Sequence, residues 1–215
     1  MNNYSQIIPG ILEKDWVEIE KKIQLVSSFA KKIHIDLIDG KFAPNVTFLD
    51  PMPFTKYTGN IEFELHMMVE EPLNFLKPFA AVGFRRFIGH IEKMSDQAEF
   101  VAEAQLLGDV SLAVDLLTPI ESIEVPFEDL DGVLVMSVKA GESGQEFVQE
   151  MLSKIEKIKN KTFIPIEIDG GINLENIVKA KESGVSRFVI TSSIFNGSES
   201  ENYNKLKSKI LGEEV

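Results

Sequence analysis

Residues 32–45, KIHIDLIDGKFAPN, form the stretch from which the rest of the chain is interpreted. The β-branched residues at 33 and 35 predict a strand, and Asp39-Gly40 predicts the turn that ends it. Because side chains alternate across a strand, His34 and Asp36 project from the same face. An imidazole and a carboxylate side by side at the end of a strand provide half of a metal site.

Two further strand-like segments end in residues of the same kind. His66 lies in FELHMMV, residues 63–69, and Asp169 ends IPIEID, residues 164–169, just before Gly170-Gly171. A single histidine beside a carboxylate is more often a hydrogen-bonded pair in the core. The candidate metal ligands are nevertheless taken together, as four side chains from three strand ends: His34, Asp36, His66 and Asp169.

Composition narrows the classes of protein that the chain can represent. With 34 acidic and 22 basic residues, the formal net charge is −12, which argues against nucleic acid or an anionic membrane as the main partner. The absence of cysteine excludes disulfides and thiolate metal sites. No secretory signal and no bilayer-spanning stretch is recognised. We therefore expect a cytoplasmic protein in which residues 1–215 form a single domain.

Apolar patterning predicts an alternation of strands and helices along the whole chain. Strands are expected at 6–12, 32–38, 61–69, 84–92, 110–116, 132–138, 163–169 and 187–191. Helices are expected at 16–29, 70–83, 96–107, 119–125, 145–159, 174–183 and 203–211. Such alternation is typical of a doubly wound open sheet or a closed (β/α)8 TIM barrel, and eight units in a chain of 215 residues favour the barrel.

The stretch from His34 to Asn45 resembles the signature of the ribulose-phosphate 3-epimerase family. Shorter matches follow in the same order at the ends of other predicted strands: residues 9–12, 65–68, 136–138, 167–172 and 192–195. The resemblance implies a (β/α)8 barrel and a metal-dependent isomerase that inverts C3 of a ketopentose 5-phosphate. Its partner is then a small-molecule sugar phosphate.

The resemblance also implies roles for individual residues. Asp36 and Asp169 would exchange protons with the substrate, and the four candidate ligands would hold one divalent metal, Zn, Fe, Mn or Co, among which ligand type does not discriminate. His90 would stand behind the ligands or be structural. The implied substrate-binding residues are Gly10, Met68, Met136, Gly141, Gly144, Gly170, Gly171, Thr191 and Ser192, although the two methionines also suit a core-filling role.

Three positions depart from the family pattern. Gly10 stands where relatives have a serine, which removes one hydroxyl from the substrate site. Thr191 stands where relatives have a glycine, and its side chain is expected to crowd the backbone. The carboxylate of Glu142 is expected to repel a phosphate unless it points to solvent or Lys139 offsets it.

These departures leave alternatives open. The leading hypothesis is the conversion of D-ribulose 5-phosphate to D-xylulose 5-phosphate. A different ketose, either a hexulose 6-phosphate or an unphosphorylated sugar, is the second, and a non-catalytic metal- or ligand-binding barrel is the third. A homo-oligomer is also considered, with the aromatic, proline-rich segment 44–57 as its contact surface.

Overall fold

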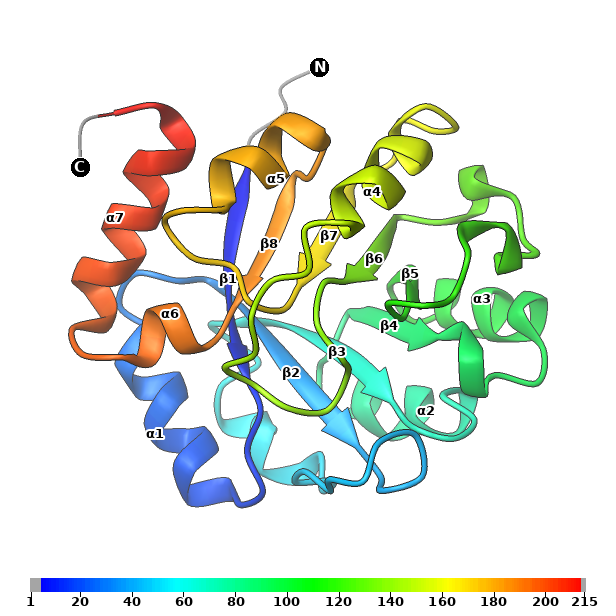
Figure 1. Cartoon of the computed structure of the whole chain (residues 1–215). Helices are drawn as coiled ribbons and strands as arrows, with labels where there is room; N and C mark the ends of the chain where they lie inside the picture. Colours follow the sequence, from blue (N-terminus) through cyan, green and yellow to red (C-terminus); the bar gives the residue numbers. More distant parts are fainter. Residues whose placement is uncertain (1–4, 214–215) are drawn as a thin grey trace.

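A closed parallel barrel is the frame of the molecule. The computed structural model describes residues 5–213, and within them eight strands pair in chain order, with the last strand pairing with the first (Figure 1). The strands are β1 (Gln6–Ile11), β2 (Lys32–Ile38), β3 (Glu62–Met68), β4 (Arg86–His90), β5 (Asp109–Val114), β6 (Gly132–Met136), β7 (Ile166–Asp169) and β8 (Arg187–Ile190). The predicted (β/α)8 barrel is confirmed.

Helices surround the barrel (Figure 1). They are α1 (Trp16–Val26), α2 (Leu73–Ala81), α3 (Gln97–Gln105), α4 (Met151–Lys159), α5 (Ile177–Ser183), α6 (Ser192–Phe195) and α7 (Glu199–Leu211). Four short 3-10 segments complete the described part of the chain: η1 (Met52–Lys56), η2 (Ile91–Lys93), η3 (Ile120–Ser122) and η4 (Phe127–Asp129).

Three predicted helices differ clearly in extent from those observed. The helix expected at 145–159 begins only at Met151, because the preceding backbone serves a loop: the side-chain amide of Gln145 donates to the carbonyls of Lys139 and Glu142, and the backbone N–H of Val148 donates to Ser137. The helix expected at 119–125 is reduced to the 3-10 turn η3. In the other direction, α7 begins at 199 rather than 203.

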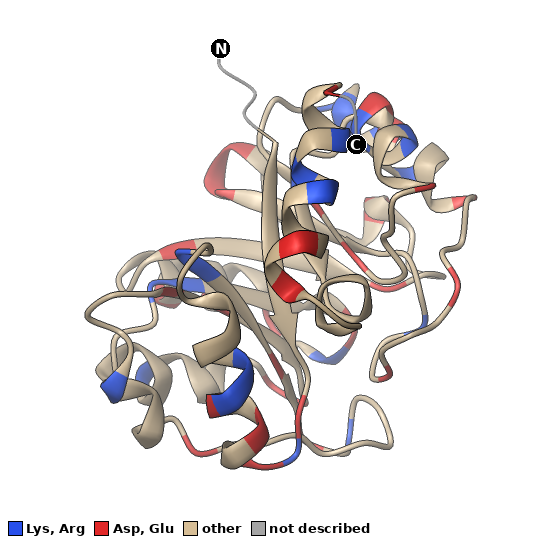
Figure 2. Cartoon of the chain, turned by 90° about the vertical axis from the view of Figure 1, so that its left-hand side faces the viewer, with Lys and Arg blue, Asp and Glu red and all other residues tan. Residues whose placement is uncertain are grey.

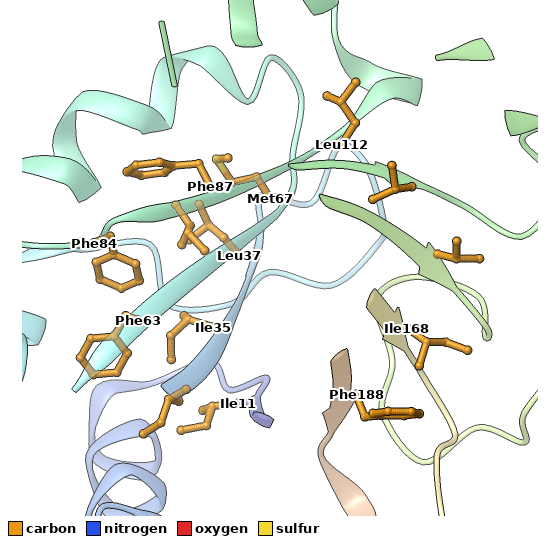
Figure 3. Close-up of a cluster of buried hydrophobic side chains, with 14 of the residues drawn as sticks. Ile11, Ile35, Leu37, Phe63, Met67, Phe84, Phe87, Leu112, Ile168 and Phe188 are labelled. Carbon is orange, nitrogen blue, oxygen red and sulfur yellow. The ribbon is translucent and has the colours of Figure 1, made fainter. Parts of the chain in front are cut away.

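The larger hydrophobic core lies between the strands and the helices. Side chains on the outward face of the strands, among them Ile35, Phe63, Phe87 and Phe188, belong to one buried cluster (Figure 3). A smaller cluster fills the interior of the barrel toward the C-terminal ends of the strands and includes Met68, Ile88, Leu134 and Met136. Strands buried on both faces explain the nearly continuous apolar runs of the sequence.

The aromatic residues of segment 44–57 belong to this core, and a contact surface on this segment stays a prediction. Phe54 is fully buried, with its ring 5.0 Å from that of Trp16 and 5.2 Å from that of Phe84. Phe48 and Tyr57 are partly buried against the same cluster. Aromatic pairs at these separations stabilise a core beyond their area of contact.

The surface carries charges of both signs. Acidic and basic segments are interspersed over the face shown in Figure 2. Among residues 5–213, no helix combines the length and the apolar character needed to cross a membrane.

Candidate metal centre and substrate pocket

The four candidate ligands meet inside the barrel. His34 and Asp36 come from β2, His66 lies opposite Asp36 in the β2–β3 register, and Asp169 is the last residue of β7. Each residue offers one donor atom, and these atoms all lie within 4.8 Å of one another. The ring centroids of the two histidines are 5.0 Å apart. The structure therefore brings together side chains that are up to 135 positions apart in the sequence (169 − 34).

The donor set is buried and incompletely satisfied by protein atoms. Nδ1 of His66 lies 2.9 Å from Oδ1 of Asp36 and 3.5 Å from Oδ2 of Asp169. Nε2 of His34 faces Oδ1 of Asp36 at 3.4 Å but has no hydrogen-bond partner among residues 5–213. A buried polar atom without a partner is costly. Two imidazoles and two carboxylates around that atom fit a divalent transition metal.

The carboxylates around His34 and His66 shift the pKa values of these two histidines, and the histidines in turn shift that of Asp36. Burial alone would lower the pKa of His34, but the carboxylates of Asp36, Glu167 and Glu64 around its ring raise that pKa well above its ordinary value. Burial would also lower the pKa of His66, which Asp169 and Asp36 raise instead. Burial would raise the pKa of Asp36, yet hydrogen bonding and attraction to the two histidines lower it. Asp36 is therefore ionised, as a metal ligand or a base must be.

A layer of charged side chains lies beneath His34, and sequence reasoning missed it. Glu64 lies with Oε1 2.7 Å from Nδ1 of His34, and its other oxygen accepts from Arg187. Arg187 also donates through Nε to Glu167 at 2.6 Å, and Arg86 donates to Glu167 at 3.3 Å. A signal was present in the sequence. Glu64 and Glu167 each stand two residues before a predicted ligand, and they therefore face the same interior.

His90 and the turn residue Asp39 are placed by their contacts. His90, the last residue of β4, lies with Nε2 2.9 Å from Nε2 of His66, on the side away from Asp36. Asp39 stabilises the turn after β2 by accepting from the backbone N–H groups of Lys41 and Phe42, and its second oxygen accepts from that of Glu70. Asp39 thus joins the ends of the two strands that carry three of the four candidate ligands.

A pocket opens beside the cluster, at the C-terminal ends of the strands. Asp36 and Asp169 contribute to its floor, and Leu12, Val138 and Ile172 add apolar walls that were not predicted. The predicted substrate-binding residues that line it are Met68, Met136, Gly141, Gly144, Gly170, Gly171, Thr191 and Ser192. His34 and His66 lie deeper, fully buried.

Gly10 lies behind the wall formed by Thr191. A Cβ atom added to Gly10 would stand 2.5 Å from Oγ1 of Thr191 and 2.9 Å from Cγ1 of Val189. The hydroxyl of Thr191 thus occupies the space that a side chain at position 10 would fill. Given the family pattern that the resemblance implies, the departures at positions 10 and 191 would be one exchange, with the hydroxyl on the residue after β8 instead of on β1.

The loop after β6 closes one side of the pocket. The carbonyl of Gly141 accepts from the side chain of Asn45 at 2.7 Å, which joins this loop to the loop after β2. Gly171 has φ +63°, and a Cβ there would meet the backbone of Phe147 at 2.7 Å, so glycine permits the close packing of this loop. Glu142 is exposed and contributes to the lining, whereas Lys139 is exposed outside it.

Comparisons with known proteins identify relatives over most of the chain. The model of the ribulose-phosphate 3 epimerase family matches residues 6–195. The ribulose-phosphate 3-epimerase of Schizosaccharomyces pombe is 31% identical over 206 residues, which cover 92% of this chain and 90% of the relative. The cytoplasmic isoform from Oryza sativa subsp. japonica is 30% identical and covers 91% and 89%. The crystal structure of KGPDC from Streptococcus mutans shares the fold, with a TM-score of 0.72, 10% identity and coverage of 98% and 99%.

Proposed function

The chain belongs to the ribulose-phosphate 3-epimerase family, and we propose that it interconverts D-ribulose 5-phosphate and D-xylulose 5-phosphate by proton transfer between Asp36, Asp169 and C3 of the sugar. The observation that carries this assignment is the convergence of two histidines and two aspartates below a pocket that both aspartates line. We also propose a cytoplasmic location, as in the rice relative.

The two aspartates suit an epimerisation because inversion at a carbon requires proton transfer on both of its faces. One carboxylate removes the C3 proton, and the electrons of that C–H bond move toward the neighbouring ketone to give a planar ene-diolate. The other residue, in its carboxylic acid form, returns a proton to the opposite face of C3. Asp36 and Asp169 come from β2 and β7, with β1 and β8 between them, and their donor atoms lie within 4.8 Å.

The residues around the aspartates hold the substrate and exclude water. His34, Asp36, His66 and Asp169 would hold a divalent metal, which would supply positive charge to stabilise the ketone oxygen as it becomes negative. Met68 and Met136, which belong to the interior cluster, present apolar walls to the reacting carbons. The backbone of Gly170, Gly171 and Ser192 suits the phosphate end of the sugar, since N–H groups in the last loops of such barrels bind phosphate.

The hydroxyl of Thr191 takes the place of the one absent at position 10. It lines the pocket and stands where the family serine would project, so the substrate retains a hydroxyl partner on this wall. This exchange supports an intact sugar site despite the two departures from the family pattern.

The proposal is tested with purified protein supplied with Zn²⁺, Mn²⁺, Fe²⁺ or Co²⁺. We expect conversion of ribulose 5-phosphate to xylulose 5-phosphate, with one solvent deuterium entering C3 of the product in D₂O. Metal-bound protein that leaves the substrate unconverted and incorporates no deuterium would refute the proposed reaction.

A second candidate differs only in the ketose. Glu142 lines the pocket with a carboxylate, which favours an unphosphorylated sugar over a phosphate dianion. Comparison of turnover across ribulose 5-phosphate, a hexulose 6-phosphate and free ketoses separates the two candidates. The E142Q variant should gain affinity for the phosphorylated substrate if the carboxylate acts on the phosphate.

A further inference from the structure

His66 lies between the candidate metal centre and a second imidazole. Its Nδ1 faces Asp36 and Asp169, while its Nε2 lies 2.9 Å from Nε2 of His90. Two ring nitrogens at this distance form a hydrogen bond only when one of them carries the hydrogen. The direction of this bond therefore determines which nitrogen of His66 is free to bind a metal.

Glu92 determines that direction from the far side of His90. One oxygen of Glu92 lies 2.9 Å from Nδ1 of His90, and the other accepts from the backbone N–H of Asp115 at 2.7 Å. A carboxylate has no hydrogen to donate, so Glu92 accepts from both of these partners.

It follows that Nδ1 of His90 carries a hydrogen. In an imidazole with its single hydrogen on Nδ1, Nε2 is the acceptor, and this is the atom that faces His66. His66 then donates from Nε2, and its Nδ1 is the atom presented to Asp36 and Asp169.

Burial and neighbouring contacts hold the hydrogen-bonded chain Glu92–His90–His66 in place. His90 is fully buried, and the ring of Phe42 covers it at a centroid distance of 4.5 Å. The carbonyl of Asp115 accepts from Nζ of Lys154 at 2.8 Å, and the same amine binds the carbonyl of Thr118 at 2.9 Å. The strand end that donates to Glu92 is thereby held in place.

We propose that Glu92 and His90 are positioning residues that hold His66 in the tautomer whose Nδ1 binds the metal. The proposal rests on the metal centre of the proposed function and assigns two residues outside its ligand set. Hydrogen-bond partners behind a metal-bound histidine typically change metal affinity about 10- to 100-fold when they are replaced.

The test begins with Zn²⁺ titrated by calorimetry into the full-length, metal-free protein. In E92Q the side-chain amide keeps its oxygen for the Asp115 N–H and turns its NH₂ group toward His90, which reverses the chain of hydrogen bonds. We expect the Kd for Zn²⁺ to rise about 10- to 100-fold. H90F should weaken binding similarly, and H90Q, whose amide oxygen can accept from His66, should restore part of the affinity.

The order of these contacts, from Glu92 through His90 to His66, also predicts how the two substitutions combine in their effect on the Kd for Zn²⁺. Because Glu92 acts through His90, E92Q should add nothing in the H90F background. In the Zn²⁺-bound wild-type protein, ¹⁵N NMR should find the His66 hydrogen on Nε2. E71Q is the matched control: Glu71 also accepts from a backbone N–H of a neighbouring loop, that of Ser95, and its replacement should leave the Kd unchanged.

Two results would overturn the proposal: an E92Q variant that binds Zn²⁺ like the wild type, or effects of E92Q and H90F that add. The H66A variant distinguishes a failure of the positioning role from a failure of the metal centre itself. If H66A loses Zn²⁺ while E92Q does not, the positioning role is wrong and the centre stands. If H66A also binds normally, the metal centre is wrong, and the positioning role fails with it.

Discussion

A side chain at position 10 should destabilise this protein because Thr191 already fills the space. In G10A the new Cβ would lie 2.5 Å from Oγ1 of Thr191 and 2.9 Å from Cγ1 of Val189, both closer than van der Waals contact. Overpacking of this kind costs about 1–3 kcal/mol. For a chain of this length each kcal/mol lowers the Tm by roughly 2–4 °C, so we expect a loss of roughly 2–12 °C.

A second substitution at position 191 identifies the atom responsible. T191A removes Oγ1 and leaves the Thr191 Cβ position 3.8 Å from the new atom, an ordinary contact. T191S keeps an oxygen in the conflicting position. The loss caused by G10A should therefore be smaller in the T191A background and unchanged in the T191S background. Recovery should be partial, since the contact with Val189 remains.

The assays are thermal and urea unfolding of the single and double variants with the wild type. The difference between backgrounds gives a coupling energy, which we expect at about 0.5–3 kcal/mol for residues in direct contact. The reasoning is refuted if G10A unfolds with the wild-type Tm, or if T191A and T191S give equal recovery. In the same set, T191A should raise KM for the sugar roughly 2- to 10-fold, while T191S should not.

Three further predictions concern the interior of the barrel. D36N and D169N should each lower kcat by about 10²- to 10⁴-fold and remove deuterium exchange at C3, while the circular dichroism spectrum stays unchanged. A large loss of Tm would instead show that the replaced residue is structural. Chelation of the metal should abolish turnover. For a metal supplied at about 100 times its Kd, chelation should also lower the free energy of unfolding by about 2.7 kcal/mol in calorimetry, and Zn²⁺ should restore both. Turnover that survives dialysis against chelator would contradict this. R187M should cost about 3–5 kcal/mol in urea unfolding because Glu64 and Glu167 lose their shared partner, and wild-type stability would show that Arg86 suffices.

The barrel was predictable because its signals are local and repeated. Each strand has an apolar run, and the eight alternations point to one topology whatever the errors at individual ends. The error at 145–159 has a different origin. The pattern over 145–150 suits a helix, but Gln145 and Val148 make their hydrogen bonds with the loop after β6, so tertiary contacts overrode local preference.

The meeting of the four candidate ligands was predictable from the sequence, but the side chains that support them were not. His34 and Asp36 share a strand, and the strand ends of a parallel barrel meet, so the sequence brings the four ligands to one place. The partners of those ligands depend on register. Glu64 reaches Nδ1 of His34 because β2 and β3 pair His34 with Glu64, a relation that periodicity within either strand does not contain. The exchange between Gly10 and Thr191 likewise requires the pairing of β1 with β8.

The charged layer explains how His34 gains a carboxylate partner without adding net negative charge beneath the reacting sugar. Glu64 orients His34, but an unpaired carboxylate there would oppose the ene-diolate as it forms. Arg187 and Arg86 contact Glu64 and Glu167, so two negative charges are balanced by two positive charges within the layer. Burial would raise the pKa of Glu167, but the attraction of Arg187, ahead of its other partners, lowers that pKa well below its ordinary value. The layer itself is therefore neutral, and Asp36 and Asp169, the proposed contacts of the metal and the substrate, lie outside it. A barrel interior filled with branched apolar side chains would pack as well, but it would leave the imidazole of His34 without an orienting acceptor.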